Sequence, residues 1–265
     1  MIYAGLNSLL ILGDDLHGID RASMIRAIKL HECSEEPGCF KASIYCAEHD
    51  PRFMFSAVAS MFILDAVDDL DSDSIVSYLK RCLSYEGGFA ECPYAESHVG
   101  ITYCAIASLK LLSRLQNVFP VDAPQTRRLI KWLLHLQSEG FHGRTKKSDD
   151  TCYSFFAGAS LRILQSADLV NQDLVLEFHR STWDPACKAF AKNSSATPDP
   201  MHAYLSLSGL SILFQGRLTA NPFVISHEHA DAALPVDLLN MVPELNITER
   251  AYTHLLALQR KWKEI

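Results

Sequence analysis

The sequence lacks a long apolar run, although 48% of its 265 residues are hydrophobic. A membrane-spanning helix needs roughly 18 consecutive apolar residues, and no segment reaches that length. The first residues also lack the basic leader that is typical of a secretory signal peptide. We therefore expect a cytoplasmic globular protein without stable membrane insertion.

Disulfide patterns and excess positive charge are also missing. The eight cysteines form no CxxC pair and no dense short framework, so we interpret most of them as reduced thiols that fill the core. Lys and Arg number 24 against 31 Asp and Glu, which gives a net charge of −7. This charge argues against nucleic acid as the main partner, although it leaves room for a local basic pocket.

Strand-like alternation of useful length is absent as well, and helical periodicity takes its place. Five segments are apolar on nearly every side, as buried helices are: 2–12, 52–66, 101–115, 151–165 and 201–214. Four amphipathic segments alternate with them: 20–31, 75–83, 125–137 and 169–180. The alternation predicts stacked hairpins, each with an outer amphipathic helix and an inner buried one.

A repeat of about fifty residues organises these hairpins. A turn-like sequence that ends in phenylalanine recurs at intervals of 49, 52 and 49 residues: Phe40, Phe89, Phe141 and Phe190. The inner segments begin at a constant interval of 50 residues: Arg52, Thr102, Cys152 and His202. Such a period predicts an array of similar units, either an open solenoid or a closed α/α toroid.

In a toroid the starts of the inner helices converge on one mouth, where helix N-termini favour anions. Residues at equivalent repeat positions then become neighbours, so Cys152 and His202 would meet, together with Asp150. A carboxylate, a thiolate and an imidazole can hold a zinc ion and leave its fourth position open, as catalytic zinc sites do. In the alternative interpretation Cys152 fills the core and His202 is a polar residue at a helix start.

A group of polar residues lies near these three in the expected fold. A histidine, a tyrosine and two cations could cradle a diphosphate, the arginine through its planar fork and the lysine as a point charge: His98, Tyr153, Arg144 and Lys147. The alternative is an ordinary solvated loop between Phe141 and Asp150.

Three segments resemble the β subunits of the protein prenyltransferases: Glu96-Ser97-His98, residues 143–155 and residues 198–204. The resemblance covers almost the whole chain, from Ile2 to Lys263. It implies an all-α fold, an α/α toroid, with residues 1–265 forming one domain. It also implies a zinc cofactor, an α-subunit partner, geranylgeranyl diphosphate and CaaX-ending proteins such as small GTPases.

Two features resemble the geranylgeranyltransferase type I branch of that family. The sequence His202-Ala203-Tyr204 fits this branch better than the farnesyl or Rab branches. Lys192 stands where this branch has a lysine and the farnesyl branch has an aspartate that binds magnesium. The resemblance therefore implies an enzyme without a magnesium requirement, which would join the geranylgeranyl group to a C-terminal cysteine as a thioether.

The resemblance assigns roles residue by residue. The zinc ligands would be Asp150, Cys152 and His202. The diphosphate and the isoprenoid would contact His98, Arg144, Lys147, Tyr153, Arg52, Lys192 and Phe156. Apolar parts of the substrate pockets would be lined by Phe53, Phe155 and Met201, with Phe53 and Met201 in the peptide pocket. The apolar residues are equally compatible with plain core packing.

The chain also departs from the family pattern. Val99-Gly100 stands where the family has Gly-Gly, and Ile101 replaces a smaller or polar residue. The series of inner helices extrapolates back to Ile2, so we expect an N-terminally truncated toroid that is poorly stable alone. This expectation leaves two alternatives open: a non-catalytic scaffold that binds the α subunit, or a farnesyl or Rab-type β subunit. A terpene cyclase is disfavoured because no acidic cyclisation motif is present.

Overall fold

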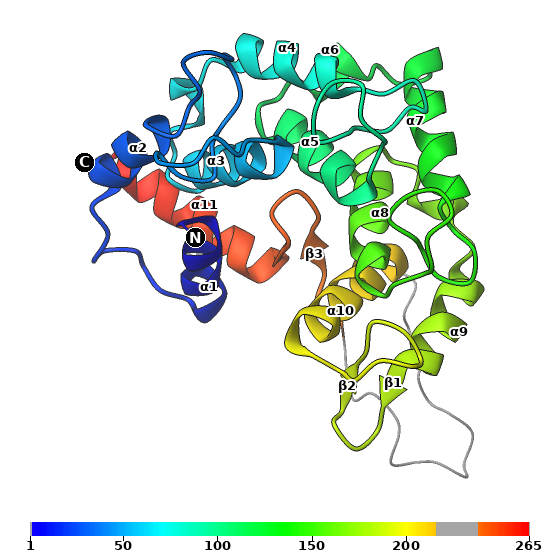
Figure 1. The fold of residues 1–265 in the computed structure, drawn as a ribbon. Helices are drawn as coiled ribbons and strands as arrows, with labels where there is room; N and C mark the ends of the chain where they lie inside the picture. Colours follow the sequence, from blue (N-terminus) through cyan, green and yellow to red (C-terminus); the bar gives the residue numbers. More distant parts are fainter. Residues whose placement is uncertain (1, 216–237, 265) are drawn as a thin grey trace.

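The computed structural model describes residues 2–215 and 238–264, and over these residues it contains two concentric sets of helices (Figure 1). The inner set is α1 (Ile2–Leu12), α3 (Pro51–Ile63), α5 (Val99–Leu111), α8 (Cys152–Ile163) and α10 (Pro200–Phe214). The outer set is α2 (Arg21–Lys29), α4 (Ser72–Cys82), α7 (Pro124–His135), α9 (Gln172–Thr182) and α11 (Glu249–Lys263). Successive inner helices contact each other along the arc seen in Figure 1. The predicted helical hairpins are therefore confirmed.

Short elements connect the two sets. Three single turns lead from an inner to an outer helix: η1 (Val67–Asp69), α6 (Leu115–Val118) and η2 (Ala167–Leu169). Two antiparallel pairs of short strands follow: β1 (Trp183–Asp184) with β2 (Ala189–Phe190), and β3 (Met241–Val242) with β4 (Ile247–Thr248). Trp183 lies opposite Phe190, and Met241 lies opposite Thr248.

The recurring phenylalanines tie each turn to the end of the preceding outer helix. Each lies opposite a residue at that helix end in a single β-bridge or short strand pair: Phe40 with Glu32, Phe89 with Leu83, Phe141 with Gln137, and Phe190 with Trp183. All four rings are at most 1% exposed. The repeat seen in the sequence is thus a repeat of buried anchors.

The inner helices are enclosed on nearly all sides, as their composition predicts. In α5 only Gly100 and Lys110 are not buried, whereas α4 buries a single stripe: Ile75, Tyr78, Leu79 and Cys82. α1 is less covered, since only Leu6, Asn7 and Leu10 are buried. Among the described residues, no helix combines the length and the apolar character needed to cross a bilayer.

Three inner helices end earlier than the sequence pattern predicts. Each is followed by a residue in the left-handed region: Asp65 (φ 54°), Ser113 (φ 56°) and Gln165 (φ 58°). The next backbone N–H then bonds back to a carbonyl inside the helix, for example from Ala66 to Met61 at 2.9 Å. This closing pattern usually has a glycine at the left-handed position, and because none is present here, the helix ends could not be recognised from the sequence.

The segment that includes β3, β4 and α11 returns to the first inner helix. Two side chains of α1 donate hydrogen bonds to the Leu245 carbonyl, Tyr3 at 2.8 Å and Asn7 at 3.0 Å. Tyr103 of α5 and Tyr204 of α10 donate to neighbouring carbonyls of the same turn, at 2.9 and 2.7 Å. Side chains of three inner helices thus converge on residues 243–246.

The close approach of α8 and α10 can be tested with a substitution at Gly209. A Cβ on Gly209 would lie 2.7 Å from the Phe155 backbone nitrogen and 2.8 Å from the Ser154 carbonyl carbon. We expect Gly209→Ala to lower the free energy of unfolding by about 1–3 kcal/mol, because backbone atoms cannot move aside cheaply. Denaturant unfolding followed by circular dichroism measures the change.

The matched control is Gly5→Ala in α1, where no atom lies within 4 Å of the added Cβ. This control should leave stability unchanged or raise it by up to about 1 kcal/mol, since alanine favours helix. Equal stabilities of the two variants would show that α8 and α10 do not approach as described.

Candidate metal centre and anion pocket

The starts of four inner helices are capped by side chains in the same way. In each, a side-chain atom accepts a hydrogen bond from the backbone N–H two residues later: Asp50 in α3, His98 in α5, Asp150 in α8 and Asp199 in α10. These N–H groups have no partner within the helix, so the caps satisfy them. The caps also place polar side chains together at one mouth.

The structure brings together the three predicted metal ligands at this mouth. One ligand atom each of Asp150, Cys152 and His202 lies within 4.8 Å of the other two. His202 Nε2 is 3.3 Å from Asp150 Oδ1, and all three residues are at most 7% exposed. The neighbouring positions of α8 and α10 account for this meeting of residues distant in sequence.

Asp199 orients the imidazole, a role that the sequence analysis missed. His202 Nδ1 lies 2.5 Å from Asp199 Oδ2 and donates its proton to this carboxylate, while Nε2 points to Asp150 Oδ1 at 3.3 Å. Hydrogen bonds from His202, first from its backbone N–H, hold the pKa of Asp199 below its usual range. Metal-binding histidines commonly donate their other N–H to a carboxylate in this way. The available signal was Asp199 followed by Pro200, a frequent helix start.

The donor set suits a borderline divalent cation. Burial raises the pKa of the Cys152 thiol, and the Asp150 carboxylate raises it further. The Lys192 ammonium, 3.7 Å from Asp150 Oδ2, opposes that increase. A bound dication would displace the thiol proton, and one oxygen, one sulfur and one nitrogen ligand fit zinc.

A cavity of about 1010 Å³ adjoins this cluster. Its wall includes nine of the residues proposed from the sequence: Arg52, His98, Arg144, Lys147, Asp150, Cys152, Tyr153, Phe156 and Lys192. The starts of α3, α5 and α8 all contribute to it, as the expected convergence of inner helices requires. Cations and helix N-termini therefore face one space.

Two uncharged donors lie side by side in this wall. His98 Nε2 is 3.4 Å from the Tyr153 hydroxyl, while Nδ1 accepts from the Gly100 N–H. Burial and the charges of Arg144 and Arg52 lower the pKa of His98. Burial raises the pKa of Tyr153 to about 12. His98 is therefore neutral with its proton on Nε2, and Tyr153 keeps its hydroxyl proton.

The arginines of the cavity are held by carboxylates. Arg52 Nη2 is 2.6 Å from Asp50 Oδ2, and Arg144 Nη1 is 3.0 Å from Glu96 Oε2. Asp50 is buried, whereas both partners of the second pair are nearly half exposed. The first pair thus fixes Arg52, and the second leaves Arg144 freer to turn toward a ligand.

On the apolar side of the cavity, the family resemblance assigned an isoprenoid contact to Phe156 but not to Ile101 or Cys104. Ile101 and Cys104 line it from adjacent turns of α5. Their spacing of three places Ile101 and Cys104 on the same face of α5. Because every face of α5 is apolar, the sequence pattern could not show which face lines the cavity.

Three predicted apolar residues lie outside the cavity wall. Met201 is 56% exposed at the start of α10, and Phe53 is half-buried on α3 near the Arg52 guanidinium. Phe155 is buried, with its ring centroid 4.9 Å from that of Tyr103. A peptide-pocket role for Phe53 and Met201 stays a prediction.

Comparisons with known proteins agree with this arrangement. The chain matches the prenyltransferase α/α-toroid domain over residues 1–247. It is 42% identical over 209 residues to the β subunit of geranylgeranyl transferase type-1 from Dictyostelium discoideum, covering 79% of this chain and 58% of that protein. The corresponding subunit of Arabidopsis thaliana is 34% identical over 218 residues, covering 80% of this chain and 57% of that protein.

A solved structure shares the fold. Protein geranylgeranyltransferase-I of Candida albicans, complexed with GGPP, matches with a TM-score of 0.74 and 25% sequence identity, covering 94% of this chain and 71% of that chain. The chain spans little more than half the length of the two curated relatives. From the domain match, the identities and the shared fold, we conclude that this chain belongs to the prenyltransferase α/α-toroid family, among the β subunits of the protein prenyltransferases.

Proposed function

We propose that this chain acts as the catalytic β subunit of a zinc-dependent protein geranylgeranyltransferase type I, in the cytoplasm and together with an α subunit. The transferred group would pass from geranylgeranyl diphosphate to the cysteine of a C-terminal CaaX sequence, as in small GTPases. The carbon–oxygen bond at C1 breaks, a carbon–sulfur bond forms and diphosphate leaves. The observation that supports this proposal most is the Asp150, Cys152 and His202 cluster beside a cation-lined cavity.

Asp150, Cys152 and His202 would hold the zinc. When bound, the metal supplies a lowered pKa for the thiol of the acceptor cysteine, which reacts as a thiolate. Asp199 keeps the proton of His202 on Nδ1 and thereby keeps Nε2 available as a ligand. Burial of all three ligand residues limits competing water.

The neighbouring polar groups would stabilise the departing diphosphate. His98 presents its Nε2–H and Tyr153 its hydroxyl, while Arg144 and Lys147 add positive charge. Because negative charge on the leaving group grows toward the transition state, donors fixed in advance lower the barrier. The uncapped N–H groups at the helix starts act in the same direction.

The apolar part of the cavity suits the prenyl chain. Ile101, Cys104 and Phe156 form this part of its wall. Phe156 belongs to a cluster of aromatic rings with Tyr103 and Phe155, whose centroids lie 5.6 and 5.3 Å from its own. This surface would bind an apolar chain while the cationic side binds its diphosphate.

The zinc proposal predicts the behaviour of Cys152→Ala. We expect the variant, purified with its α subunit, to contain one zinc equivalent less than the wild type. Geranylgeranylation of a Leu-ending CaaX peptide should fall by at least about 100-fold, because a direct ligand is lost. Metal analysis and a peptide assay measure the two effects, with the exposed-thiol variant Cys187→Ala as control. Zinc-free protein with full activity would refute the zinc proposal, and folded, inactive wild type would favour a scaffold.

The orienting role of Asp199 predicts a change in zinc affinity. Asp199→Asn keeps a side-chain oxygen to cap α10 but removes the charge beside His202. We expect zinc affinity to fall about 10–100-fold, as measured by competition with a chelating dye. Asp71→Asn changes the cap of the outer helix α4, which also accepts from two backbone N–H groups, and should leave zinc affinity unchanged. Similar affinities in both variants would contradict the role of Asp199.

The position of Lys192 predicts independence from magnesium. Its ammonium lies in the cavity wall and supplies positive charge directly. We expect the wild-type rate, in buffer with zinc, to be the same with and without added Mg²⁺. Lys192→Asp should be slower and should recover in part with Mg²⁺, since a carboxylate can bind the ion. A wild-type enzyme that requires Mg²⁺ would contradict this assignment.

A further inference from the structure

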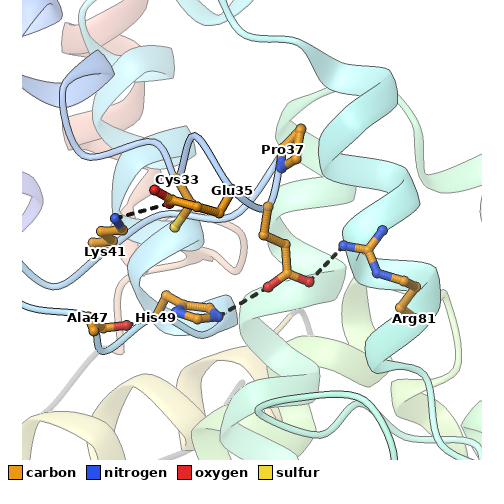
Figure 2. Close-up of a pocket in the computed structure, with 8 residues that line it drawn as sticks. Cys33, Glu35, Pro37, Lys41, Ala47, His49 and Arg81 are labelled. Atoms are coloured by element: carbon orange, nitrogen blue, oxygen red, sulfur yellow. Dashed lines mark hydrogen bonds and ion pairs between the residues drawn. The ribbon is translucent and has the colours of Figure 1, made fainter.

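We propose that a second zinc site lies in the connection between α2 and α3, with Cys33, Cys39 and His49 as ligands. One ligand atom of each residue lies within 4.8 Å of the other two. The cluster borders a pocket whose lining includes Cys33, His49 and Arg81, which Figure 2 labels, and also Glu36. It is built from residues separate from the Asp150 cluster.

The two cysteines are cross-strand neighbours. The bridge between Glu32 and Phe40 sets Cys33 opposite Cys39, and the Cys33 N–H donates to the Cys39 carbonyl at 2.9 Å. Their sulfur atoms lie 2.7 Å apart, and both residues are at most 4% exposed. The backbone therefore presents two sheltered sulfur ligands side by side.

The turn itself does not require these thiols. In the next two repeats the position of Cys39, just before the buried phenylalanine, is occupied by Gly88 and Gly140. Those glycines have no room for a Cβ, because Trp132 and Phe178 cover them. The first repeat instead has space for a side chain and places a thiol there.

His49 is oriented as a metal ligand would be. Its Nδ1 lies 2.8 Å from the Ala47 carbonyl, and donation of this N–H leaves the lone pair of Nε2 available. Metal-bound histidines typically make such a bond to a backbone carbonyl or carboxylate. The side chain of His49 is 38% exposed, so an ion can enter from solvent on this side.

Glu36 completes the charge balance. Its Oε2 is 3.2 Å from His49 Nε2, and its Oε1 is 2.8 Å from Arg81 Nη2. In Figure 2, dashed lines run from His49 and from Arg81 to the carboxylate between them. With two thiolates and this carboxylate, a dication and Arg81 neutralise the cluster. Because Glu36 contacts Nε2, the nitrogen that would bind the ion, it is positioned as a fourth ligand.

The ligand chemistry selects zinc. Two thiolates and an imidazole form a common tetrahedral zinc set, with zinc–sulfur distances of about 2.3 Å. That geometry separates the sulfurs by roughly 3.8 Å, so binding would widen the present pair through rotation about the Cα–Cβ bonds. Because His49 adjoins Asp50, the ion would also anchor the cap of α3 and, through Asp50, the Arg52 guanidinium.

The test uses the full chain with Cys152→Ala as background, so that the first cluster cannot contribute. Protein purified with zinc and a phosphine reductant is gel-filtered, and its metal content is measured. We expect stoichiometric zinc to remain, and to be lost in His49→Ala and in Cys39→Ser. The control variant Cys46→Ser, which replaces a thiol between Cys39 and His49 in the sequence, should keep its zinc. Cobalt in place of zinc should give a sulfur-to-metal charge-transfer band that Cys39→Ser removes.

Three results would overturn the proposal. These are metal-free protein in the Cys152→Ala background, zinc content unaffected by His49→Ala, and a Cys33–Cys39 disulfide found by peptide mass analysis of protein purified with zinc. His49 is partly exposed, so its variant tests the site even where Cys39→Ser fails to fold. The test does not depend on transferase activity. If the wild-type protein proved to bind no zinc at the Asp150 cluster, the test of the Cys33, Cys39 and His49 site would still be valid.

Discussion

The backbone N–H groups at the starts of the inner helices determine where the polar side chains of the candidate site lie. A buried helix start needs partners for these groups, and four inner helices obtain one from an Asp or His side chain. Because the helices are arranged in an arc, their caps meet at one mouth. Each capping residue therefore serves both the fold and the candidate site. Asp199, for example, also orients the imidazole of His202, and Asp50 also orients the guanidinium of Arg52.

Much of the fold could be predicted because apolar residues recur at equivalent positions of each repeat. Phe40, Phe89, Phe141 and Phe190 are buried at equivalent places, and their spacing is visible in the sequence. The ends of the inner helices were not visible. Asp65, Ser113 and Gln165 adopt a left-handed conformation that glycine usually signals, so the apolar pattern continued past the true ends. The packing of the segment 238–264 against α1 could not be predicted from the apolar pattern either, because it depends on contacts between residues far apart in the sequence.

The candidate site, like the fold, could be predicted from the sequence only in part. Equivalent repeat positions placed Asp150, Cys152 and His202 together correctly, because a constant period becomes a neighbour relation in an arc of helices. The pairs Arg52 with Asp50 and Arg144 with Glu96 depend on side-chain conformations that no spacing encodes. The same holds for Cys33 and Cys39. Most cysteines were expected to be core thiols, and nothing in the spacing singles out these two, which the bridge between Glu32 and Phe40 sets opposite each other.

The turn at residues 243–246 is held both by its main chain and by the buried side chain of Leu245. Tyr3, Tyr103 and Tyr204 all donate to backbone carbonyls, so side-chain replacements in the turn outside buried Leu245 would preserve these contacts. An inserted or deleted residue would shift the carbonyls out of register with hydroxyls fixed on three helices. Evolution of this turn should therefore tolerate changes of sequence far better than changes of length.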